Sequence, residues 1–245
     1  MRKIKGILFD KDGTVVDFNA TWVPVLRRLA LDLADGDTKR ADDMLASGGF
    51  DAATGSIAAG SLLGAGHTRA IVRHWYPDAD AERFGALCRR VDAAFLAGGV
   101  ECSVAITGAA DLLAQLADAG YRLGIATNDS TAAAEAALGQ LGLAGHFDRV
   151  IGYDAVAEPK PAADMVHLFC RSAGLQPDEV AMVGDNAHDL HMARAAGAVA
   201  VGVLSGNSPR EALEPLADAV VGSIVDLPAW LDERDSQVSE VALTA

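Results

Sequence analysis

The sequence predicts an α/β fold in which a parallel sheet is covered by helices on both faces. The first observation is a short apolar run at residues 4–9, which is typical of a buried strand. The second is the regular alternation, after Cys102, of Val- and Ile-rich runs with helix-length amphipathic segments. Strands that are apolar along their whole length are buried on both faces, so the alternation favours a parallel sheet between two helical layers.

The elements after Cys102 can be placed by their apolar pattern and by the glycines that end them. Strands are expected at residues 121–126, 150–151, 180–183, 199–203 and 219–221. Helices are expected at residues 107–119, 131–141, 162–173 and 190–196. A glycine follows each of these helices, which indicates its C-terminus.

Residues 18–102 lack a strand pattern and are expected to form a helical cap domain inserted after the first strand. Apolar residues recur at helical spacing at 22–33, 41–45, 71–75 and 84–95. Thr21 is a candidate N-cap, which would place Pro24 in the tolerated first turn. The α/β core domain then comprises residues 1–17 and 103–234, and residues 235–245 are expected to be a frayed tail.

Composition bounds the class of protein and its partners. The 245 residues are 51% hydrophobic and 22% charged, with a formal net charge of −14. This acidity argues against nucleic acid as a partner, and no apolar run is long enough to span a membrane. Cys88, Cys102 and Cys170 lie far apart without metal-ligand spacing, which favours reduced thiols in a cytoplasmic protein without a signal peptide.

Two carboxylates, Asp10 and Asp12, follow the first strand directly, and Gly13 marks a sharp exit from it. Alternate residues of an extended chain point the same way, so both can converge on one point with Lys11 turned aside. Two close carboxylates repel each other, so they need a cation, a shared proton or a separate role for each. Oxygen ligands without a nearby cysteine favour Mg²⁺. An ordinary acidic turn is the alternative.

Polar residues stand near three further strand ends. Thr127 and Asn128 offer a hydroxyl and an amide, Lys160 is a cation between two prolines, and Asp185 and Asp189 add carboxylates. Ligands of open parallel sheets bind at the carboxyl ends of the strands. Together these groups indicate a site for a metal-bound phosphate.

The four motifs, in this order, resemble those of the haloacid dehalogenase superfamily. They are Asp10 to Thr14, Thr127-Asn128, Lys160-Pro161, and Gly184-Asp185 through Asp189. The chain is most similar to helical-cap members of the phosphoglycolate-phosphatase-like subgroup, and the motifs span all of it except the tail. It departs from that subgroup at Ala163, where a second proline is common. The resemblance implies a Rossmann-like core sheet.

The resemblance also implies a role for each motif residue. Asp10 would be the nucleophile that forms an aspartyl phosphate, and Asp12 the general acid and then base. Asp10, Asp185 and the backbone carbonyl of Asp12 would hold Mg²⁺. Asp189 would bind the metal through water or orient the other ligands, and phosphate oxygens would be held by Thr127, Asn128 and Lys160.

Other polar residues have ordinary structural interpretations. His188 and His191 fit a solvated helix face, and Lys11 fits a structural or peripheral role. Charged residues of the cap are expected at its surface rather than on a substrate: Lys39, Arg40, His67 and Arg69. The Gly-, Ala- and Ser-rich residues 56–66 are the candidate lining of the site entrance.

The favoured function is a Mg²⁺-dependent phosphatase for a small phosphorylated metabolite, with phosphoglycolate as the candidate that the subgroup suggests, acting as a monomer or homodimer. One alternative is a phosphomutase of the β-phosphoglucomutase type, and another is a binding protein without catalysis. A binding protein does not need both Asp10 and Asp12. Dehalogenases of the superfamily lack the second aspartate, and a phosphonate-cleaving relative would need Lys39, the one lysine of the cap, for a Schiff base.

Overall fold

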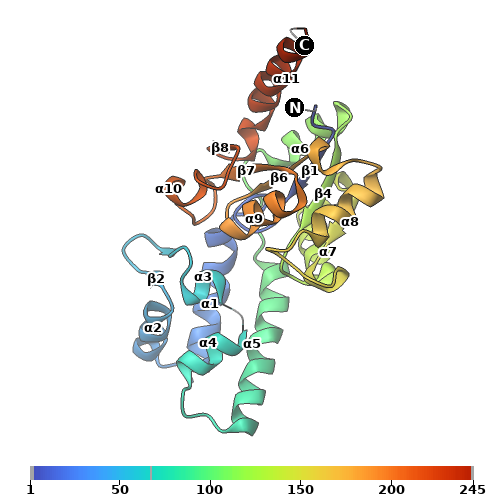
Figure 1. Cartoon of the computed structure of the whole chain (residues 1–245). Coiled ribbons are helices and arrows are strands. Elements are labelled where there is room, and N and C mark those ends of the chain that lie inside the picture. Colours follow the sequence, from blue (N-terminus) through green and yellow to red (C-terminus); the bar gives the residue numbers. More distant parts are fainter. Residues whose placement is uncertain (1–2, 67, 244–245) are drawn as a thin grey trace. The chain divides into compact units, whose positions relative to one another are not determined.

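A computed structural model describes residues 3–66 and 68–243 of the chain (Figure 1). The chain divides into two compact units, one formed by Met1–Asp17 with Ala105–Ala245 and the other by Phe18–Val104. We call these the core unit and the inserted unit. The second boundary lies two residues beyond the one expected at 102/103.

The core unit is built on one sheet of six parallel strands in the order β5-β4-β1-β6-β7-β8. The strands are β1 (Gly6–Phe9), β4 (Arg122–Ala126), β5 (Arg149–Ile151), β6 (Val180–Gly184), β7 (Val199–Val203) and β8 (Ala219–Val221). The α/β fold with a parallel sheet is therefore confirmed.

Helices cover both faces of this sheet, because successive side chains of each strand point to opposite faces. Ile7 and Phe9 enter a core with residues of three helices, which are α6 (Ala109–Asp118), α7 (Thr131–Gln140) and α11 (Leu227–Leu243). Leu8 enters a second core with residues of three others, which are α8 (Asp164–Ala173), α9 (Ala187–Ala196) and α10 (Arg210–Leu213). Two apolar layers thus hold the sheet from both sides.

Strand β1 lies at the topological switch point of the sheet. The chain adds β4 and β5 on one side of β1 and then β6, β7 and β8 on the other. Phe9 is paired in register with Ile125 of β4 and with Val183 of β6, so these strands end at nearly the same level. In such sheets the switch point is where ligands bind.

The inserted unit has its own apolar core and consists mainly of helices. These are α1 (Phe18–Leu33), α2 (Thr38–Ser47), α3 (Leu62–Ala65), α4 (Thr68–Trp75) and α5 (Ala81–Glu101). The expectation of an insertion without strands was wrong in one place. Within the presumed loop, β3 (Ser56–Ile57) pairs antiparallel with β2 (Phe50–Asp51), because Phe50 and Ile57 both bury their side chains in this core.

Two local predictions were wrong. Helix α1 begins at Phe18, so Pro24 lies inside the helix and Thr21 is buried rather than an N-cap. The continuous apolar face from Val25 to Leu33 offsets the backbone hydrogen bond that Pro24 cannot donate. Residues 235–243, expected to fray, continue α11, because Leu227 and Leu231 anchor its start in the core and extending a formed helix is easy.

Across the described residues, none of the helices combines the length and the apolar character needed to cross a membrane.

Candidate active site

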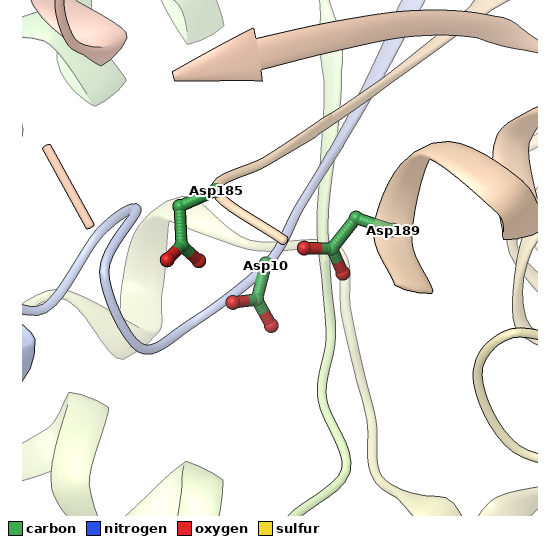
Figure 2. A group of neighbouring side chains, drawn as sticks. All are labelled: Asp10, Asp185 and Asp189. Atoms are coloured by element: carbon green, nitrogen blue, oxygen red, sulfur yellow. The ribbon is translucent and has the colours of Figure 1, made fainter. Parts of the chain in front are cut away.

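Three aspartates form an acidic cluster at the carboxyl ends of β1 and β6. Asp10 follows β1, Asp185 follows β6, and Asp189 belongs to the first turn of α9. One carboxylate oxygen from each lies within 4.8 Å of the others. Figure 2 shows the three carboxylates turned toward a common space. Asp185 and Asp189 are buried and Asp10 is 9% exposed, so strong mutual repulsion has to be offset.

Lys160 supplies the offsetting charge. Its Nζ donates to Oδ1 of Asp10 at 2.6 Å and to Oδ1 of Asp189 at 2.5 Å. Burial lowers the pKa of Lys160, but Asp10 and Asp189 more than compensate, so its net pKa is raised and it stays protonated. Burial also raises the pKa of Asp10, and Lys160 partly opposes that rise.

Asp189 uses both of its oxygens on protein groups. Oδ1 accepts from Lys160, and Oδ2 accepts the backbone N–H of Asn186 at 3.1 Å, as part of the capping box that begins α9. This suits a residue that orients Lys160 and its neighbours.

A third loop, which follows β7, closes on the cluster and was missed by the sequence analysis. The backbone N–H of Asn207 donates to Oδ2 of Asp185 at 3.2 Å, and Oγ of Ser205 donates to the carbonyl of Gly13 at 2.8 Å. A Cβ on Gly206 would lie 1.8 Å from Oδ2 of Asp185, so only glycine lets the loop come this close. The sequence did contain a signal for this loop. Ser205, Gly206 and Asn207 follow a predicted parallel strand, and ligands bind at the carboxyl ends of such strands.

Asp12 is held by a different cation, Lys11. Lys11 Nζ lies 2.6 Å from Oδ2 of Asp12 and 3.1 Å from Oδ2 of Asp129. Of the two roles expected for Lys11, structural or peripheral, the peripheral one was wrong, and its ammonium is not turned aside from Asp12. Its side chain is buried, and its long stem lets the ammonium reach the carboxylate of the next residue.

Thr127 and Asn128 follow β4 as expected, with different surroundings. Thr127 is buried, and its Oγ1 accepts the backbone N–H of Asp129 at 3.1 Å. Asn128 is exposed. Lys160 donates hydrogen bonds to Asp10 and Asp189, and Asp185 lies beside them in the acidic cluster. Thr127 instead connects through Asp129 to Lys11 and Asp12.

The remaining histidine, arginine and lysine candidates that the structure describes lie at the surface of their units. His188 and His191 are exposed on α9. Arg40 lies over the ring of Tyr76 and Arg69 over the ring of Phe84, which accounts for both guanidinium groups by stacking. Lys39 is exposed, and His67 lies outside the described residues.

The acidic cluster fits a divalent metal ion by donor type and by charge. All of its donor atoms are carboxylate oxygens, which hard divalent cations prefer. Three carboxylates and the ammonium of Lys160 leave a net charge of −2 when all are ionised. Asp10 and Asp185 are the residues that could hold such an ion directly.

The fold and the site together define an α/β protein with a buried carboxylate cluster at the switch point of its sheet. The family model of haloacid dehalogenase-like hydrolases matches residues 4–197. The chain therefore belongs to the haloacid dehalogenase-like hydrolase family.

Individual relatives resemble the chain over most of its length. It is 33% identical to Probable phosphatase IndB of Dickeya dadantii, with 88% of this chain and 87% of that protein covered. It is 32% identical to a phosphoglycolate phosphatase of Chromobacterium violaceum, with 93% and 96% covered. A crystal structure of a predicted phosphoglycolate phosphatase from Haemophilus somnus 129pt shares the fold with a TM-score of 0.74, at 21% identity and with 94% and 98% covered.

The first prediction concerns the loop after β7. Gly206→Ala places a methyl group against Asp185 and should weaken divalent metal binding by about 10- to 100-fold, the usual effect of disturbing a group that orients a ligand. Calorimetric titration with Mg²⁺ or Mn²⁺ measures this. Gly139→Ala, in helix α7 with nothing within 4 Å of the added Cβ, is the matched control and should bind like wild type. Equal affinities for both variants would contradict the role of Gly206.

The second prediction concerns pH. Burial, with the nearby Asp189 adding to it, raises the pKa of Asp185 to about 7, whereas an exposed aspartate titrates near ~3.9. Between these values the folded state holds a proton that the unfolded state has released. The free energy of unfolding contributed by this group therefore falls as pH rises from about 4 to about 7.

We expect the Tm of the protein in EDTA to decrease across this range, and Asp185→Asn to show a shallower decrease because an amide does not titrate. Saturating divalent metal should oppose the decrease, since the metal binds the ionised carboxylate. Scanning calorimetry at several pH values provides the measurement. Identical slopes for the wild type and Asp185→Asn would show that Asp185 is ionised throughout.

Proposed function

We propose that the protein is a Mg²⁺-dependent phosphatase that hydrolyses a small phosphomonoester through an aspartyl phosphate on Asp10. The observation that carries the proposal is the contact of Lys160 with Asp10 and Asp189, beside Asp185, at the switch point of the sheet. Membership of a hydrolase family and 32–33% identity to relatives named as phosphatases support it.

In the first step Asp10 attacks phosphorus. A carboxylate oxygen of Asp10 forms the new P–O bond while the bond from phosphorus to the alcohol oxygen breaks. Asp12 gives its proton to that oxygen, so the product leaves as a neutral alcohol. Lys160 holds the Asp10 carboxylate in a fixed orientation during the attack.

In the second step water replaces Asp10 on phosphorus. Asp12, now ionised, takes a proton from the water, the water oxygen bonds to phosphorus, and the bond to the Asp10 oxygen breaks. Inorganic phosphate forms and both aspartates return to their starting states. One group with two oxygens, Asp12, therefore serves as acid and then as base.

Charge balance and positioning supply the rest of the catalysis. Mg²⁺, held by Asp10, Asp185 and the Asp12 carbonyl, would supply charge stabilisation for the transferring phosphoryl group. Lys160, Thr127 and Asn128 hold phosphate oxygens, and Asp189 keeps Lys160 in place. Phosphate monoesters hydrolyse so slowly alone that accelerations reach ~10²¹, which makes this electrostatic role central.

The names of the relatives support one candidate substrate. Several at 29–32% identity are phosphoglycolate phosphatases, so 2-phosphoglycolate is the first compound to test.

The third prediction tests the reaction and the metal. Purified protein with Mg²⁺ should release inorganic phosphate from at least one small phosphomonoester in a panel of phosphorylated metabolites. EDTA should abolish the release, and Ca²⁺ should inhibit because its looser coordination positions the groups less well. Full activity in excess EDTA would refute the requirement for a divalent metal ion. Transfer of the phosphoryl group to a second sugar hydroxyl, with little inorganic phosphate, would replace the phosphatase with a mutase.

The fourth prediction tests the nucleophile. Asp10→Asn should reduce turnover to less than about a hundredth of the wild-type rate, because an amide is a poor nucleophile. Acid-quenched wild-type enzyme should carry phosphate on Asp10, detectable by peptide mass spectrometry. Asp118→Asn, an exposed carboxylate at the end of α6, is the control and should keep full activity. A variant at position 10 that folds and retains more than that fraction would exclude the covalent route.

A further inference from the structure

Lys11 is a buried cation that the proposed mechanism does not use. Its side chain is 2% exposed, although it lies between two aspartates of the motif that follows β1. A buried ammonium is costly unless charged partners and hydrogen bonds replace the lost water. Burial does lower the pKa of Lys11, but Asp12 and Asp129 raise it by more, so the group remains charged.

The partners of Lys11 differ from those of Lys160. Lys160 contacts Asp10 and Asp189, whereas Lys11 contacts Asp12 at 2.6 Å and Asp129 at 3.1 Å. The two aspartates with opposite tasks, the nucleophile and the acid–base group, therefore have separate lysines. A lysine that served only to neutralise the acidic cluster would not need this division.

Asp129 gives Lys11 a fixed point of attachment. The backbone N–H of Asp129 donates to Oγ1 of Thr127, and its carbonyl accepts the N–H of Tyr153 at 2.9 Å. The loop is also packed tightly, because a Cβ on Gly152 would lie 2.6 Å from the Asp129 carbonyl oxygen. Asp129 is thus held by the loops that follow β4 and β5, and Lys11 connects this rigid edge to Asp12.

We infer that Lys11 is a positioning residue, anchored by Asp129, that sets the orientation of the Asp12 carboxyl for both proton transfers of the proposed phosphatase. An ammonium only donates hydrogen bonds. Because Lys11 donates to Oδ2, a proton on Asp12 is carried by Oδ1. Lys11 therefore decides which oxygen of Asp12 exchanges a proton with the alcohol and the water. The inference rests on the proposed function.

Lys11→Met, which removes the charge and keeps the length of the stem, tests it with two substrates. For the alkyl phosphate that the wild type turns over fastest, kcat should fall by about a hundredfold with KM within about twofold, since proton donation is worth that much or more. For p-nitrophenyl phosphate the first step needs little proton donation. The variant should therefore release a burst of about one p-nitrophenol per active site, followed by slow turnover, because only the hydrolysis step still needs Asp12.

Two further variants make the result specific. Lys5→Met removes an exposed lysine that pairs with Glu179 just before β1, and should keep wild-type rates with both substrates. Asp129→Asn leaves the contact between Lys11 and Asp12 but weakens the contact between Lys11 and residue 129. It should show a smaller fall in kcat for the alkyl phosphate and a smaller burst with p-nitrophenyl phosphate. It also tests the inference if Lys11→Met fails to fold, which thermal unfolding will reveal.

The inference is overturned if Lys11→Met keeps the alkyl phosphate rate within about threefold, or if both substrates slow equally without a burst. Equal slowing of both substrates without a burst is the result expected if Lys11 has a purely structural role. If wild-type protein releases no phosphate, the proposed function fails separately. Crystal structures of the wild type and Lys11→Met then decide, and an unchanged Asp12 side chain in the variant overturns the positioning role.

Discussion

The structure of the site depends on one buried interaction, in which the ammonium of Lys160 lies among carboxylates that are shielded from water. Asp10 and Asp189 each lie within hydrogen-bonding distance of it. Without this cation, three close carboxylates in a buried setting would have to take up protons or separate, since burial already raises the pKa of Asp185 and Asp10. An ion pair of this kind contributes little net stability, but it favours the ionised form of Asp10 over the protonated one and holds its carboxylate in one place.

The backbone around the cluster is as specific as the side chains. Added side-chain atoms at Gly13 and Gly206 would collide with Asp185, and at Gly184 with Asp189. Three loops from three strand ends therefore meet at distances that only glycine allows. The polar contacts described for the site all join residues of the core unit.

The periodicity of the sequence was sufficient to predict the sheet, its two helical layers and the strand ends after which Asp10 and Asp185 lie, whereas Lys160 lies in the longer segment between β5 and α8. These features follow from patterns of burial over many residues. What could not be predicted depends on single contacts. The reach of Lys11 toward Asp12, and the approach of Gly206 to Asp185, require knowledge of where two loops lie in space. Pro24 in α1 shows the same limit, because packing along the whole helix outweighed a local rule.

Asp189 links the folding of a helix to the charge of the site. One of its oxygens closes the first turn of α9 through Asn186, and the other binds Lys160. A helix is hardest to form at its first turn, where several backbone groups must be ordered together. The same carboxylate that neutralises Lys160 therefore helps to nucleate α9, so the assembly of the site and the start of this helix form one cooperative unit. A substitution that shortens or removes this side chain therefore changes both the charge beside Lys160 and the first turn of α9.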